Sequence, residues 1–136
     1  MSIRFPFERE RSSLFGWVYR PYAVVSFWSK KWDEWLDIGM IVDSGADYTM
    51  LPRTYIAELG IDGKHETREL STRGVGGSSR VYLLRRKHRI KLGRWERQIP
   101  LGFIDAIDIP PLLGRQDFME TFRFTLHNHT TEIDIG

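Results

Sequence analysis

Ile41-Val42-Asp43-Ser44-Gly45-Ala46-Asp47-Tyr48-Thr49 is the most informative segment of this sequence. It begins in a continuously apolar run, as a strand does where it enters a core, and the run ends at the acidic residue Asp43. A carboxylate at the edge of a core is costly unless it is paired or functional. Gly45 allows the backbone to turn sharply and a ligand to approach it closely. The alternative interpretation is a strand-to-turn aspartate that accepts a hydrogen bond from its own turn.

The length and composition of the chain limit the classes of protein and of functional site to which Asp43 can belong. The 136 residues correspond to one domain at roughly 150 residues per domain. The sequence is 41% hydrophobic and 28% charged, which excludes a fully disordered chain and a coiled coil. It contains no cysteine, so a disulfide framework, a thiol nucleophile and a cysteine-bound zinc are excluded. A formal net charge of +2 gives no argument for nucleic-acid binding.

Short stretches rich in β-branched and aromatic residues lie on both sides of Asp43 and predict an all-β fold. Residues 22–28 and 34–42 flank a polar turn and predict a hairpin. Pro52 and Gly60 bracket one short helix. Further strands are expected at residues 81–84, 89–92, 99–104, 122–126 and 131–135.

These elements fit a single domain. We expect residues 22–136 to form a closed β-barrel with one or two short helices. Residues 1–21, which are charged and interrupted by Pro6, are expected to form an N-terminal arm. The chain shows no secretory signal and no stretch of the ~20 apolar residues that a membrane helix needs, so the expected location is cytoplasmic.

Two further motifs follow Asp43 along the chain. Arg73-Gly74-Val75-Gly76-Gly77-Ser78 is rich in glycine, and Leu112-Leu113-Gly114-Arg115 places two apolar residues before a glycine. In their order and spacing, the three motifs resemble the catalytic loop, the flap tip and the segment that crosses behind the catalytic loop in retropepsin-like (retroviral-type) aspartic peptidases. The resemblance extends over residues 22–135 and implies the barrel of the acid-protease type.

The resemblance implies a role for each residue of the catalytic loop and the flap. Asp43 would be the catalytic aspartate, Ser44 would join two catalytic loops by hydrogen bonds, and Gly45 would offer its backbone to the substrate. The substrate-binding residues would be Ala46, Asp47, Gly74, Val75, Gly76 and Gly77.

The third motif would support the site. Leu113 and Gly114 would cross behind the catalytic loop, and Arg115 would pair with the region of Asp47 and brace it. The alternative for Arg115 is a solvated charge at the start of a helix, because exposed ion pairs usually contribute little.

The implied mechanism needs two carboxylates that share one proton across an attacking water, and aspartic proteases are the usual example of such a pair. This chain contains one Asp-Ser/Thr-Gly sequence. The second aspartate would come from a second copy, because a two-fold symmetric dimer brings a residue to its own mate. We expect a homodimeric aspartic endopeptidase that cleaves a peptide or protein, with no cofactor, metal, nucleic acid or membrane as a partner.

The alternative function is a catalytically weak protein of the same fold that binds extended peptides or scaffolds an assembly.

Three other patterns favour structural interpretations. The glycine-rich segment lacks the Gly-Lys-Ser/Thr ending of a phosphate loop. The basic run at residues 85–89 would divide between two faces of a strand. His127 and His129 lack a third metal ligand, and Asn128 between them favours a turn. We expect Trp28, Trp32 and Trp35 to pack on the barrel or across a subunit contact; the alternative is a patch that recruits another protein.

Overall fold

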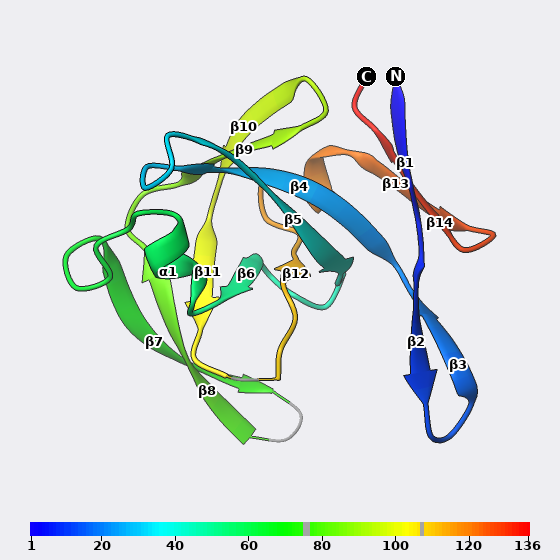
Figure 1. Ribbon diagram of the computed structural model, residues 1–136, viewed down its shortest axis with the longest axis horizontal. Helices are drawn as coiled ribbons and strands as arrows, with labels where there is room; N and C mark the ends of the chain where they lie inside the picture. Colours follow the sequence, from blue (N-terminus) through cyan, green and yellow to red (C-terminus); the bar gives the residue numbers. More distant parts are fainter. Residues whose placement is uncertain (75–76, 107) are drawn as a thin grey trace.

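The computed structural model describes residues 1–74, 77–106 and 108–136. Short strands and two one-turn helices make up these residues (Figure 1). In chain order they are β1 (Ser2–Pro6), β2 (Glu8–Ser12), β3 (Gly16–Arg20), β4 (Tyr22–Ser29), β5 (Glu34–Val42), β6 (Thr49–Pro52), α1 (Tyr55–Glu58), β7 (Thr67–Gly74), β8 (Gly77–Leu84), β9 (His88–Leu92), β10 (Trp95–Ile99), β11 (Leu101–Ile104), β12 (Leu112–Leu113), a 3₁₀ helix (Met119–Thr121), β13 (Arg123–His127) and β14 (Thr130–Asp134).

The hairpin β4–β5 lies at the centre of the fold, and its sequence alternates as a half-buried strand pair requires. Ala23, Val25 and Phe27 on β4 are fully buried, while the residues between them are partly exposed. The antiparallel register pairs Ala23 with Met40 and Val25 with Ile38, which are also buried. The predicted hairpin is therefore confirmed, and β5 ends directly before the aspartate of the first motif.

Nine strands form the main sheet, in the order β10-β9-β4-β5-β12-β6-β11-β8-β7. β12 lies between β5 and β6, parallel to β5 and antiparallel to β6, and β11 runs parallel to β6. Strands β10 and β7 are the edges, and no pairing between described residues joins them. On β10, Trp95 packs on Phe122 with ring centroids 4.4 Å apart. The mostly β class is confirmed, whereas closure into a barrel stays a prediction.

The two ends of the chain form a separate sheet of three strands, β1, β14 and β13. β1 pairs antiparallel with β14, from Ser2 opposite Asp134 to Pro6 opposite Thr130. Ile133 on β14 is fully buried and belongs to the main core. β2 and β3 pair with each other as a projecting hairpin (Figure 1). The expected N-terminal arm thus comprises a strand of this sheet and a hairpin, and the domain boundary at residue 22 stays a prediction.

The helix predicted after Pro52 is a single turn, α1. Gly60 follows it with a φ of +70°, and a β-carbon there would lie 2.6 Å from the backbone nitrogen of Lys31. Glycine is therefore required at this position for both conformation and space. No helix in the described part of the chain is long and apolar enough to cross a membrane.

Candidate active site

Asp43 stands at the carboxyl end of β5, where the chain leaves the core. Its backbone nitrogen donates to the Leu113 carbonyl over 3.0 Å, and its own carbonyl accepts from the nitrogen of Ala46 over 3.1 Å. The Oδ1 atom of Asp43 accepts from the nitrogen of Gly45 over 2.9 Å. This last bond is the local turn bond of the alternative interpretation. It also fixes the carboxylate, whose Oδ2 accepts no hydrogen bond from the described residues.

The segment that follows β12 crosses directly behind this loop. Leu112 and Leu113 pair in parallel with Ile41 and Val42. Beyond them, the nitrogen of Arg115 donates to the Ala46 carbonyl over 3.0 Å. Asp43 and Ala46 of the loop are therefore hydrogen-bonded to backbone that lies about seventy residues later in the chain.

Gly114 is the point of closest approach between the two segments. A β-carbon on Gly114 would lie 2.3 Å from the carbonyl carbon of Tyr48 and 2.8 Å from the nitrogen of Thr49. The nitrogen of Gly114 donates to Oγ1 of Thr49, which is fully buried. Buried polar groups need such partners, so Thr49 holds the crossing segment in place. The sequence analysis did not single out Thr49. The one sequence feature that could have identified it is a polar residue at an inward-facing position of a strand.

Arg115 and Asp47 form an ion pair at the edge of the loop. Arg115 Nη2 lies 2.5 Å from Asp47 Oδ1, with side-chain exposures of 43% and 76%. At this exposure the pair contributes about 0–1 kcal/mol to stability. The ion pair mainly holds Asp47 in place against the crossing segment. The nitrogen of Gln116 does the same, since it donates to the Asp47 carbonyl over 2.8 Å.

The other predicted loop residues occupy distinct environments. Ser44 and Gly45 are exposed and Ala46 is buried. In the described part of the chain, the Ser44 hydroxyl takes part in no hydrogen bond. The surface of the loop is thus open beside Asp43, while its underside is held by the crossing segment.

The predicted flap is the hairpin β7–β8, which forms one end of the main sheet (Figure 1). Gly74 and Gly77 pair at the end of its ladder. Val75 and Gly76 lie outside the described residues. The structure therefore places a hairpin where the glycine-rich motif predicted one.

Tyr48 is a further residue of the site that the sequence did not reveal. Its ring lies against Gly102 of β11, where a β-carbon would be 2.7 Å from Cε2. Burial, and secondarily the carboxylate of Asp47, raise the pKa of the Tyr48 phenol. The phenol therefore stays protonated near neutral pH.

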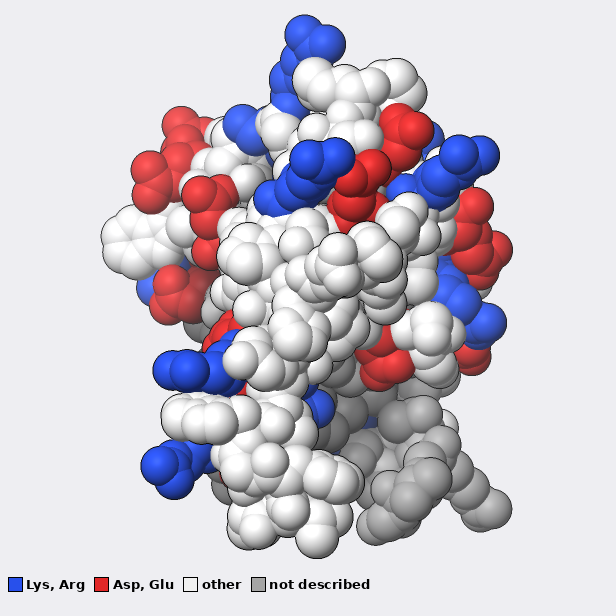
Figure 2. All heavy atoms as spheres, turned by 90° about the vertical axis from the view of Figure 1, so that its right-hand side faces the viewer, with Lys and Arg blue, Asp and Glu red and all other residues white. Residues whose placement is uncertain are grey.

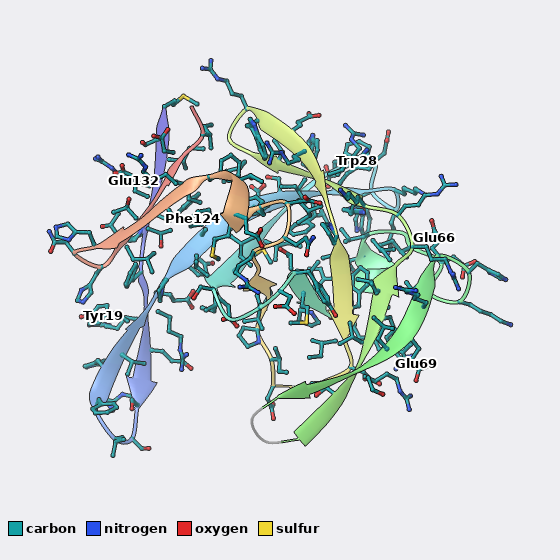
Figure 3. The ribbon with its side chains drawn as sticks, turned by 180° about the vertical axis from the view of Figure 1, so that it is seen from behind. Tyr19, Trp28, Glu66, Glu69, Phe124 and Glu132 are labelled. Carbon is teal, nitrogen blue, oxygen red and sulfur yellow. The ribbon has the colours of Figure 1, made fainter. Side chains whose placement is uncertain are left out.

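An open groove of about 680 Å³ adjoins Asp43. It lies between the end of β3 and residues 109–112, and its lining includes Tyr19, Pro21, Ile41 and Pro110. Figure 3 shows Tyr19 at one end of the molecule and Trp28 and Glu66 at the other. The basic run at residues 85–89 lines a different cavity, which also contains Trp28 and Glu66. No cluster of three metal-ligating side chains occurs within the described ranges.

Comparison with known proteins agrees with this geometry. The fold is similar to the crystal structure of a retropepsin-like aspartic protease from Rickettsia conorii, with a TM-score of 0.66, 16% identity and coverage of 97% of this chain and 98% of that one. It is also similar to EIAV protease complexed with the inhibitor HBY-793, with a TM-score of 0.54, 22% identity and coverage of 75% and 86%. No curated protein sequence matches the chain. The family model described as aspartyl protease matches residues 33–116, more than half of the sequence and all three motifs. The chain belongs to the aspartyl protease family.

Proposed function

We propose that this protein is an aspartic endopeptidase whose catalytic carboxylate is Asp43. The observation that carries the proposal is the way the Asp43 loop is held. Backbone hydrogen bonds to residues 113–116 fix its underside, while Ser44 and Gly45 are exposed beside the carboxylate. A reactive group held rigidly by the scaffold and open to a ligand is what peptide hydrolysis requires.

The active form is a homodimer in this proposal. The chain has one Asp-Ser-Gly, and hydrolysis by this family's chemistry uses two carboxylates. An isologous two-fold interface places Asp43 of one chain against Asp43 of the other. Two like charges about 3 Å apart cannot both ionise, so the pair keeps one proton, as is usual for aspartic proteases.

The pair of carboxylates then acts on a water molecule between them. The ionised carboxylate accepts a proton from the water, which attacks the peptide carbonyl, and the protonated carboxylate donates to the carbonyl oxygen. The roles reverse when the amine leaves. The substrate lies extended between the Asp43 loops and the Gly74–Gly77 flaps and is held as an added strand by backbone hydrogen bonds. Ala46 and Asp47 line this cleft, and Leu113, Gly114 and Arg115 support it.

The test is cleavage of an unfolded protein between about pH 4 and pH 6, where a pair with one proton is active. Asp43→Asn should abolish cleavage and leave the fold intact, because the amide keeps the shape of the carboxylate but cannot accept the water proton. Asp33→Asn is the matched control. Asp33 lies in the β4–β5 turn at a φ of +52°, which asparagine tolerates well.

The two variants separate the candidate functions. Loss of cleavage in Asp43→Asn alone supports the peptidase. Retained turnover in purified Asp43→Asn would rule out the mechanism. A wild-type protein that binds unfolded chains without cleaving them would instead support the weak or scaffolding alternative.

A further inference from the structure

We propose that the β2–β3 hairpin is a dimerisation arm, and that each chain packs this hairpin on a second copy of the protein beside the Asp43 loop. The inference rests on the proposed two-Asp43 site and names the surface that holds the two chains together.

Large apolar side chains are exposed on this hairpin to an unusual degree. Leu14 and Phe15 in its turn are 79% and 74% exposed, and Trp17 and Tyr19 on β3 are each 44% exposed. Within the described ranges, the other large apolar side chains in this class are Met1, Trp32 and Leu126. A cluster of exposed apolar side chains marks an interaction surface.

The hairpin projects in an ordered way, so its apolar tip is presented outward. The nitrogens of Leu14 and Phe15 both donate to Oγ of Ser12 over 3.2 Å, which fixes the turn. At the base, the ring of Tyr19 stacks on His129 with centroids 4.0 Å apart. A two-stranded hairpin is only marginally stable by itself, so burial against another surface would complete it.

The exposed surface of the hairpin is continuous with the candidate active site. The nitrogen of Val42 donates to the carbonyl of Pro21 over 3.0 Å, which ties the end of the hairpin to the residue before Asp43. The groove of about 680 Å³ runs between β3 and Asp43. Figure 2 shows the side of the molecule from which the hairpin projects, where uncharged side chains form a band between charged margins.

This continuity identifies the occupant as a second copy. A two-fold interface that contains Asp43 contains the same patch from both chains. A stable interface buries about 800 Å² per partner, which is more than the few exposed residues of the Asp43 loop can supply. The adjoining apolar surface of β3 and its turn supplies the remainder.

Part of the charge of the hairpin is paired or packed within it. Arg20 forms an ion pair with Glu10. The guanidinium groups of Arg9 and Arg11 lie 4.1 Å and 5.1 Å from the ring centroid of Trp17. These contacts hold the three arginine side chains against the hairpin itself.

The contact uses the turn and the side chains of β3 rather than the free edge of β2. The sequence of β2 is Glu-Arg-Glu-Arg-Ser. If two β2 strands paired antiparallel about a two-fold axis at Arg9, that residue would face the partner's Arg9 and Glu8 would face the partner's Glu10. Like charges directly opposite each other destabilise a sheet, so this pairing is disfavoured.

The experiment measures the dimer dissociation constant of the full chain by sedimentation equilibrium. Leu14→Ser/Phe15→Ser should raise the constant by at least about tenfold, since truncation of buried anchors costs interfaces most. Both substitutions lie in an exposed turn whose serine cap is kept, so folding is preserved. Trp32→Ser is the matched control, an exposed aromatic in the β4–β5 turn, and should change the constant by less than about twofold.

A second readout follows the hairpin directly in the unmutated chain. With 5-fluorotryptophan incorporated, the ¹⁹F resonance of Trp17, assigned through Trp17→Phe, should shift on dilution through the dissociation constant, while that of Trp32 should not. An unchanged constant in the double variant, or a Trp17 resonance independent of concentration, would overturn the dimerisation arm and leave the two-Asp43 site standing. A fully active wild-type monomer would overturn both.

Discussion

Gly114 shows how a single residue sets the geometry of the Asp43 loop. Because Gly114 has no side chain, the crossing segment can approach the backbone between Tyr48 and Thr49. A β-carbon at this position would lie only 2.3 Å from the carbonyl carbon of Tyr48. The obstacle is the backbone of Tyr48 and Thr49, so no side-chain rotation relieves it. The loop and the crossing segment would have to separate if the position carried any side chain.

Gly114→Ala should therefore destabilise the protein by about 1–3 kcal/mol, the usual cost of overpacking a close-packed site. It should also lower activity, because the Asp43 nitrogen bonds to the neighbouring Leu113 carbonyl. Urea unfolding measures the stability. Gly63→Ala is the control, since a β-carbon there would meet Ile56 at an ordinary 3.4 Å; its expected change is within about 0.5 kcal/mol. Equal losses in the two variants would contradict the role given to Gly114.

At the scale of elements, His88 joins β9 to the end of β4. Its Nε2 donates to the Trp28 carbonyl over 2.8 Å. Burial lowers the pKa of His88 below 6.5, and the cations Lys30 and Arg89 act in the same direction. The bond to Trp28 and the carboxylate of Glu66 oppose the shift without cancelling it. His88 is therefore neutral in the folded protein at pH 7.

This burial makes stability depend on pH. Below pH 6.5 the unfolded chain binds a proton at His88 that the folded chain does not, so stability should fall as pH decreases from 6.5 toward the folded pKa. The slope is at most about 1.4 kcal/mol per pH unit. His88→Gln keeps a donor for Trp28 and should flatten the slope between pH 7 and pH 5.5, whereas the exposed His127→Gln should not. Urea unfolding at both pH values measures the pH dependence of stability. Equal slopes in wild type and His88→Gln would refute the claim that His88 causes this dependence.

How far the sequence predicts the fold differs from element to element. β4 alternates so regularly that its pairing with β5 follows from the pattern. β7 reads Thr-Arg-Glu-Leu-Ser-Thr-Arg-Gly, with Leu70 as its one large apolar residue. It is an edge strand held by backbone hydrogen bonds to β8. Such bonds do not require an alternation of apolar and polar side chains, so the sequence of β7 shows no strand pattern. The expected barrel closure depended on such edges, and for that reason residue patterns could not establish it.

The candidate site divides in the same way. Asp43, Gly114 and Arg115 belong to local motifs and could be named from sequence. Thr49 and Tyr48 act through partners on β11 and the crossing segment, which only the folded chain brings near. A motif identifies the residues whose role is fixed by their neighbours in the chain. It does not identify those whose role depends on a distant strand.

At the scale of the whole molecule, the proposed site is shared by two chains, so activity should follow the number of intact dimers and not the number of chains. Wild type mixed with Asp43→Asn forms heterodimers with one carboxylate. Such a dimer has no second group to share the proton and should be nearly inactive. Because assembly follows mass action, the same reasoning predicts that specific activity falls on dilution below the dissociation constant.

Subunit exchange turns this into a quantitative test. At constant total protein well above the dissociation constant, random pairing makes activity proportional to the square of the wild-type fraction, so an equal mixture should keep about a quarter of the wild-type activity. Asp33→Asn in place of Asp43→Asn is the control and should leave the mixture fully active, because its heterodimers contain two Asp43 carboxylates. A linear dependence on the wild-type fraction, with about half the activity in the equal mixture, would mean that each chain carries a complete site. The carboxylate beside Asp43 would then have to come from the same chain, and the two-fold arrangement would be wrong.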